Sequence, residues 1–243
     1  MIGHHAIAVE GATNVGLVRR RNEDALYVGT SLIAVADGLG GHVAGDVASS
    51  TAIEALKPYD QHTEPNLLAT TLARAVHMVN GALHKRIVAD PALAGMGTTL
   101  VATLWSGRTA ALANLGDSRA YLLPTSLNGP AALIQVTEDH IYQHVVAEAR
   151  IVPTLPERLA RFLDGRPDGR SPDITVRTFD PGDRILLCSD GLSSYVAHDA
   201  IHRTLSERDI SPGETADRLI NLALEQGGPD NITVAVIDVR RGQ

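Results

Sequence analysis

Short apolar runs separated by polar turns recur along the whole chain and predict a protein rich in β-strands. Some runs alternate apolar and polar positions, as strands with one buried face do, and others are continuously apolar, as fully buried strands are. The expected strands lie at about 5–10, 25–29, 32–36, 98–105, 109–114, 119–123, 132–136, 173–179, 184–189 and 231–239.

Two helical patterns lie between the third and the fourth of these runs. The first, roughly 43–57, is rich in alanine and includes Val47, Ile53 and Leu56. In the second, apolar residues recur every three or four positions and form one stripe: Leu68, Leu72, Ala75, Val79 and Leu83. Because the two patterns are adjacent and amphipathic, we expect a helix hairpin that lies on a sheet.

A later helix is marked at both ends. Ser211-Pro212-Gly213-Glu214 supplies an N-cap, a proline at the first helical position and a capping-box glutamate. Gly227-Gly228-Pro229 ends the helix directly before Asp230.

The order of strands and helices predicts an α+β fold of two mainly antiparallel sheets with helices outside. We expect residues 1–243 to form a single domain, since the linker-like stretch 164–173 is short.

Composition narrows the class of protein. A net charge of −7 and an aromatic content of 3% argue against nucleic-acid binding, which needs a basic face and stacking rings. The N-terminus lacks the basic-then-apolar order of a secretory signal, and no apolar run approaches the roughly 20 residues that span a bilayer. The one cysteine, Cys188, lies in an apolar run and fits a reducing compartment. We therefore expect a soluble cytoplasmic protein, or a domain of a longer one.

Three aspartates lie at the ends of strand-like runs: Asp37, Asp190 and Asp230. Carboxylates at strand ends can converge on one edge of a sheet, and oxygen-only ligation suits Mg²⁺ or Mn²⁺. These residues make the chain a candidate metal-dependent hydrolase.

Further polar segments accompany these aspartates, and each has a simpler interpretation when taken alone. Gly38 follows Asp37 and offers a free carbonyl as a ligand, although Asp-Gly is also the commonest turn dipeptide. The run from Arg19 to Asp24 could hold a phosphate, or it could be a solvated charged turn. Gly116-Asp117-Ser118 could bring Asp117 to the same edge, or it could be an ordinary hairpin.

Taken in order, these segments resemble the metal-dependent serine/threonine protein phosphatases of type 2C, the PPM family, and most closely its bacterial members. The resemblance runs from about residue 8 to residue 238. Its matching stretches are Gly16-Leu17-Val18-Arg19 with Asn22-Glu23-Asp24, Val35 to His42, Gly95-Met96-Gly97-Thr98-Thr99, Gly116-Asp117-Ser118-Arg119, Thr137-Glu138-Asp139-His140, Ser189-Asp190-Gly191-Leu192 and Pro229-Asp230-Asn231-Ile232-Thr233.

The resemblance implies a four-layer fold, a central β-sandwich flanked by helix pairs, with two Mn²⁺ or Mg²⁺ ions at one end. It implies that a hydroxide bridging the two ions hydrolyses phosphoserine or phosphothreonine in proteins. The implied metal ligands are Asp37, which bridges both ions, the Gly38 carbonyl, Asp190 and Asp230, with Asp117 at a weaker third ion. Arg19 is the implied phosphate ligand, Glu23 and Asp24 act through waters, and Asn231 stands with them behind the ligands.

Two features depart from the family pattern. Leu39 occupies a position where many eukaryotic members carry a histidine, so His42 becomes the candidate proton donor, with helix capping as the alternative. Ser194 stands where some members carry another carboxylate, which weakens a third metal site.

The segment 139–172 should form the flap over the cleft, and it matches the family poorly after His140. His140, His144 and Glu148 share one face of a possible helix there, and zinc binding is an alternative to a solvated flap.

The main hypothesis is a monomeric phosphatase that reverses the action of a bacterial serine/threonine kinase on phosphorylated proteins. A narrow-specificity phosphatase acting on one regulator is the enzymatic alternative. A non-catalytic pseudophosphatase that binds phosphoproteins is the other. The full set of aspartates and Arg19 argues against a pseudophosphatase.

Overall fold

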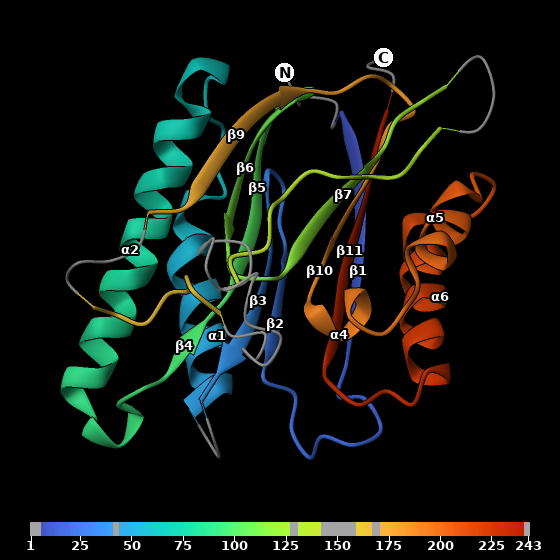
Figure 1. Ribbon diagram of the computed structural model, residues 1–243. Helices are drawn as coiled ribbons and strands as arrows, with labels where there is room; N and C mark the ends of the chain where they lie inside the picture. The colour runs from blue at the N-terminus through green and yellow to red at the C-terminus, as the bar shows by residue number, and fades with distance from the viewer. Residues whose placement is uncertain (1–5, 41–43, 127–130, 142–158, 167–170, 241–243) are drawn as a thin grey trace, which may run out of the picture.

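Two antiparallel sheets pack against each other at the centre of the molecule (Figure 1). The computed structural model describes residues 6–40, 44–126, 131–141, 159–166 and 171–240. In spatial order the first sheet contains β1 (Ile7–Asn14), β11 (Ile232–Val239), β10 (Arg184–Cys188), β7 (Arg119–Leu123) and β8 (Ile134–Gln135). The second contains β2 (Asp24–Val28), β3 (Leu32–Leu39), β5 (Leu100–Ser106), β6 (Thr109–Leu115) and β9 (Asp173–Thr178), with β4 (Gly97–Thr98) paired to β3.

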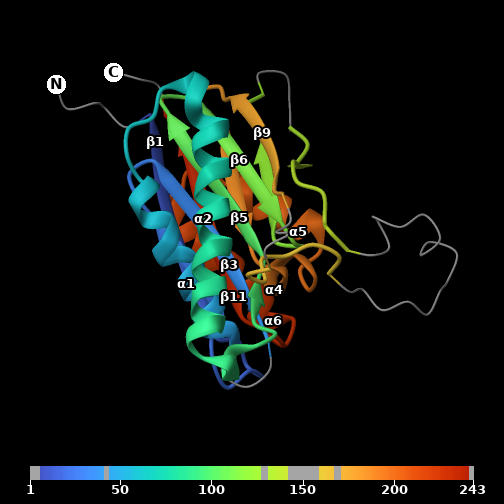
Figure 2. The same ribbon diagram turned by 90° about the vertical axis from the view of Figure 1, so that its left-hand side faces the viewer.

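Helices cover the outer faces of both sheets. The long helices α1 (Ala44–Leu56) and α2 (Leu68–Ala89) lie over the second sheet, in front of β3, β5 and β6 in Figure 2. The helices α4 (Asp190–Ser193), α5 (His198–Ser206) and α6 (Pro212–Glu225) lie over the first sheet. Single 3₁₀ turns occur at Lys57–Tyr59, Pro65–Leu67 and Pro91–Leu93. The predicted α+β sandwich with helices outside is confirmed.

Alternation along β3 explains how this strand serves two cores. Ile33 and Val35 face the other sheet, where they join the apolar residues between the two sheets. Ala34 and Ala36 face the helices, as Leu32 does. A strand buried on both faces must be continuously apolar, which is the pattern read from the sequence.

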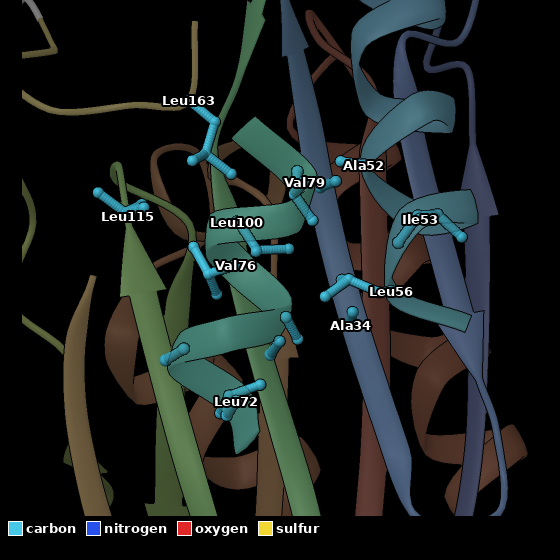
Figure 3. Close-up of a cluster of buried hydrophobic side chains, with 14 of the residues drawn as sticks. Ala34, Ala52, Ile53, Leu56, Leu72, Val76, Val79, Leu100, Leu115 and Leu163 are labelled. Carbon is cyan, nitrogen blue, oxygen red and sulfur yellow. The ribbon is translucent and has the colours of Figure 1, made fainter. Parts of the chain in front are cut away.

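The helix hairpin packs on the second sheet through the stripe predicted for α2. Leu72, Val76 and Val79 point toward the sheet, where Figure 3 shows them with Ile53 and Leu56 of α1. Each of these five side chains is buried. Small side chains on both elements, Ala48 and Ala52 of α1 and Ala34 and Ala36 of β3, share this core and leave room for close packing.

The N-cap and the first-position proline predicted for α6 are present. The Ser211 hydroxyl accepts a hydrogen bond from the Glu214 amide at 3.1 Å, and Pro212 opens the helix. The Glu214 carboxylate accepts from Arg218 one turn later, at 2.7 Å.

Some boundaries differ from the sequence prediction. The first strand spans Ile7–Asn14 instead of 5–10, because its register with β11 extends to Asn14 opposite Ile232. The run at 98–105 is divided at Thr99 into β4 and β5. The sequence did not predict the short helices α4 and α5, because each has too few turns to produce a periodic pattern of apolar residues. Of the helices described, none is long and apolar enough to cross a membrane.

Truncation of Leu72 tests the helix–sheet core. Leu72 is completely buried, so Leu72→Ala leaves a cavity and should lower the free energy of unfolding by about 2–5 kcal/mol. The matched control is Leu67→Ala, because Leu67 is 49% exposed and its truncation should change stability by about 0.5 kcal/mol or less. Urea unfolding followed by circular dichroism measures both. Equal losses would contradict the packing described for α2.

Candidate functional site

A cavity of about 300 Å³ lies at the end of the sandwich where β3, α4 and the start of β11 meet. Segments from the beginning, middle and end of the chain contribute to its wall. The lining residues are Arg19, Glu23, Asp37, Gly38, Leu39, Gly40, Asp190, Asp230 and Asn231. The three strand-end aspartates are therefore brought together in one cavity wall.

The remaining predicted site residues lie behind the cavity wall or outside the described part of the chain. Asp24 pairs with Asp37 across the β2–β3 ladder and accepts a hydrogen bond from Ser189 at 2.8 Å. Asp117 lies in the turn between β6 and β7, near enough to Asp37 and Asp190 to repel both electrostatically. His42 falls outside the described residues, as do His144 and Glu148 of the flap.

The Gly-Thr-Thr segment fixes the backbone of Asp37. The Asp37 carbonyl accepts from the Thr99 amide at 2.8 Å and from the Thr98 hydroxyl at 2.9 Å. The Asp37 amide donates to the Thr99 hydroxyl at 3.2 Å. The Thr99 hydroxyl in turn lies 2.7 Å from that of Ser118, next to Asp117. Two motifs seen separately in the sequence thus position one carboxylate.

Glycine at 191 allows α4 to approach the start of β11. A Cβ at Gly191 would lie 1.8 Å from the Asn231 carbonyl oxygen, so a larger residue would force the two segments apart. Because Asp190 and Asp230 precede these two contacting residues, the close approach places their carboxylates on the same wall of the cavity.

Asn231 anchors the loop that carries Arg19 and Glu23. Its amide oxygen accepts from the Glu23 backbone at 2.8 Å, and its amide nitrogen donates to the carbonyls of Val15 and Arg21, each at 2.9 Å. The sequence analysis placed Asn231 behind the implied metal ligands but did not predict which groups it contacts. Its observed contacts show that it holds the loop against β11.

The segment Thr137–His140 has a similar positioning role, which the sequence motif alone did not reveal. Asp139 accepts two-point hydrogen bonds from Arg119, with the shortest at 2.6 Å. His140 Nδ1 accepts from the Gly116 amide at 3.1 Å, so the ring holds the turn that carries Asp117. The other ring nitrogen lies 2.9 Å from Asp173.

Arg19 stands at the rim of the cavity, where its guanidinium donates to Asp230 at 2.6 Å. The Arg19 side chain is 52% exposed, so its guanidinium remains accessible to a ligand. The second Asp230 oxygen accepts from the Asn231 amide at 2.8 Å. Asp230 is thus held between an arginine and a backbone donor.

Buried negative charge dominates the electrostatics of the site. Burial raises the pKa of Asp37 well above its usual value, and the charges of Asp24 and Asp190 raise it further. Burial raises the pKa of Asp24 to about 6, and burial together with Asp190 raises that of Asp117 to about 7. Burial and the charge of Asp230 also raise the pKa of Asp190. Protons or cations must compensate this charge.

The donors present fit hard divalent cations. They are carboxylate and carbonyl oxygens, which suit Mg²⁺ and Mn²⁺, whereas the buried Cys188 does not line the cavity. Within the described ranges, no three His, Cys, Asp or Glu side chains are grouped closely enough to hold one ion by themselves. Such ions keep several water ligands, so a partial protein shell is compatible with binding.

A protein-family model described as protein phosphatase 2C matches residues 19–222. The chain belongs to the protein phosphatase 2C family. This confirms the family resemblance read from the sequence.

Curated relatives of the chain carry phosphatase names. It is 44% identical over 231 residues to the serine/threonine protein phosphatase PstP of Mycobacterium tuberculosis, an alignment that covers 92% of this chain and 43% of that protein. It therefore spans less than half the length of PstP. It is 36% identical over 246 residues to the serine/threonine phosphatase stp of Listeria monocytogenes, with 94% of each chain covered.

Solved structures confirm the fold. A crystal structure of M. tuberculosis PstP superposes with a TM-score of 0.86 at 42% identity, covering 97% of this chain and 99% of that one. A structure of the PstP catalytic domain in complex with two manganese ions superposes with a TM-score of 0.85 at 42% identity, with the same coverage.

Replacement of Asn231 tests its anchoring role. Asn231→Asp removes the two amide donors and places a carboxylate against two carbonyl oxygens, so the free energy of unfolding should fall by about 1–3 kcal/mol. Asn66→Asp is the matched control, since Asn66 is exposed and its change should be within about 0.5 kcal/mol. Urea unfolding provides the comparison. An equal response of the two variants would argue against the anchor.

The raised carboxyl pKa values predict how the stability of metal-free protein depends on pH. A carboxyl whose pKa is higher in the folded state stabilises the fold below its unfolded pKa and loses that contribution as pH rises through the folded pKa. In EDTA, the contribution of Asp117 should therefore decline between about pH 4 and about pH 7, where its folded pKa lies. Asp117→Asn should flatten this part of the curve of unfolding free energy against pH.

The control for this measurement is Asp199→Asn, because Asp199 is exposed on α5. It should leave the pH curve parallel to that of the parent. If the unfolding free energy of the parent and of Asp117→Asn changed equally between pH 4 and pH 7, the raised pKa of Asp117 would be contradicted.

Proposed function

We propose that this chain is a metal-dependent protein phosphatase that hydrolyses phosphoserine and phosphothreonine in proteins. The observation that carries the proposal is one cavity in which an accessible arginine, Arg19, stands over partly buried aspartates from three distant segments. Membership of the protein phosphatase 2C family and the phosphatase names of its relatives support it.

The proposed metal ligands are Asp37, the Gly38 carbonyl, Asp190 and Asp230, with Asp117 and Asp190 available to a weaker third ion. The two manganese ions of the PstP catalytic domain support Mn²⁺ here, and the same oxygen donors suit Mg²⁺. When bound, a pair of such cations supplies an activated water nucleophile and neutralises charge on the phosphoryl group.

Residues of the chain bind and orient the substrate. Arg19 can turn from Asp230 to the phosphate and donate two parallel hydrogen bonds to its oxygens. Asp24 and Glu23 can accept hydrogen bonds from waters on the bound ions and so orient those waters. His42 stays the proposed proton donor for the departing serine or threonine oxygen.

Direct hydrolysis does not require Cys188. That thiol is fully buried, and burial raises its pKa to about 12, so it is protonated at neutral pH and poorly nucleophilic. Cys188→Ser should therefore retain turnover wherever the fold is intact.

The biological setting forms part of the same proposal. We infer that residues 1–243 act as a single catalytic domain, with 139–172 as its flap. The protein would work as a cytoplasmic monomer that reverses the action of a serine/threonine kinase on its targets. Relatives named as serine/threonine phosphatases support phosphorylated proteins as the substrate class.

Hydrolysis of p-nitrophenyl phosphate tests the proposed activity. The parent chain should turn it over with Mn²⁺ and lose that activity in EDTA, and Asp190→Ala should lower kcat/KM by about 100-fold or more because it removes a metal ligand. Asp199→Ala is the control, an exposed aspartate whose loss should leave the rate unchanged.

The outcome also separates the alternatives. Equal, negligible activity of the parent with and without Mn²⁺ would reject the enzyme and favour a phosphoprotein-binding module. If the parent is active, a panel of phosphoproteins distinguishes a broad enzyme from one restricted to a single regulator.

A further inference from the structure

Three consecutive arginines follow the rim of the site, and the proposed reaction uses the first of them. A second hollow, of about 410 Å³, is lined by Arg19, Arg20, Arg21, Glu23 and Asn231. Arg19, Glu23 and Asn231 also line the aspartate cavity, so the two hollows share a wall. Arg20 and Arg21 belong to the second hollow.

The backbone that presents these arginines is fixed. The Arg21 carbonyl accepts from the Asn231 side chain at 2.9 Å, and the Leu17 amide donates to the Gly228 carbonyl at 2.7 Å. Both ends of the segment 17–21 are therefore attached to the stretch that leads into β11. A fixed backbone limits the positions that the guanidinium groups of Arg20 and Arg21 can reach.

The two hollows differ in charge. Asp37, Asp190 and Asp230 make the floor of the first acidic, whereas three arginines and a single acid line the second. The one acid, Glu23, lies against Gly45 of α1 and interacts electrostatically with Arg19 and Arg21, so it offsets part of the positive charge and leaves the hollow basic. In a chain of net charge −7, this basic rim offers local attraction to anions.

We propose that Arg20 and Arg21 form a second anion site, which selects substrates with an acidic group near the phosphorylated residue. The group is a carboxylate or phosphate on the residue that follows the phosphoserine or phosphothreonine held at Arg19. The inference rests on the proposed function, since the phosphate at Arg19 sets the register of the peptide.

The dimensions and the chemistry of the hollow agree with this substrate class. An extended peptide advances about 3.3 Å per residue, so a neighbouring acidic side chain can reach a hollow that shares a wall with the site. Guanidinium groups bind carboxylate and phosphate through two parallel hydrogen bonds, a geometry that lysine does not reproduce.

The experiment compares three phosphothreonine peptides that differ at the position after the phosphothreonine. One carries alanine, one carries glutamate, and one carries a non-hydrolysable phosphonate analogue of phosphoserine. With Mn²⁺, the parent should show a kcat/KM about tenfold higher for at least one anionic peptide than for the alanine peptide. The two anionic arms tell which anion the site prefers.

The decisive variant is Arg20→Ala/Arg21→Ala, in which the ratio of anionic to alanine kcat/KM should fall to about one. The matched control is Arg74→Ala/Arg177→Ala, which removes the same net charge from exposed positions on α2 and β9 and should keep the parent ratio. p-Nitrophenyl phosphate, which has no flanking residues, shows whether each variant still folds and turns over substrate.

An unchanged ratio in Arg20→Ala/Arg21→Ala, or an equal fall in Arg74→Ala/Arg177→Ala, would overturn the second anion site. If the parent hydrolyses none of the substrates, the proposed function fails separately. In that case, fluorescence anisotropy of the same three peptides, each with a fluorescent label, tests the second anion site by binding. The anionic peptides must bind more tightly than the alanine peptide, and Arg20→Ala/Arg21→Ala must abolish the difference. Equal binding would reject the site.

Discussion

Repulsion between partly buried carboxylates is the constraint on which the rest of this site depends. Asp24, Asp37, Asp117 and Asp190 each have a raised pKa, to which the charge of at least one neighbouring aspartate contributes. A flexible scaffold would relieve that repulsion by moving the carboxylates apart. The fold resists this because hydrogen bonds and close backbone contacts hold the segments that carry them. Charge concentrated in this way is what makes the cavity suited to cations.

The scaffold keeps the carboxylates from moving apart because the two sheets are joined at the site. Thr99 follows β4 of the second sheet, and Ser118 precedes β7 of the first, so their hydroxyl contact at 2.7 Å spans both. On the other side, Asn231 holds the loop with Arg19 against β11. Neither sheet can slide along the other without changing the distances among the aspartates.

Much of this arrangement was predictable from local patterns. Runs of apolar residues gave the strands, the spacing from Leu68 to Leu83 gave α2, and aspartates at strand ends gave Asp37, Asp190 and Asp230. Contacts between distant segments were not predictable in this way. The anchoring by Asn231 and the support that His140 gives to Gly116 depend on which carbonyl or amide lies opposite, and no spacing in the sequence encodes that. The short helix α4 also has too few turns to leave a periodic signal.

The pairing of Arg19 with Asp230 has a thermodynamic consequence. In the structure, the arginine serves as the counterion of Asp230, which is one of the proposed metal ligands. If a cation bound at Asp230, as proposed, the guanidinium would lose its partner and become available to a phosphate. Occupancy by one ligand would then strengthen binding of the other, and linkage would require the effect to be mutual. Under the proposed function, metal binding and phosphoprotein binding would therefore be coupled.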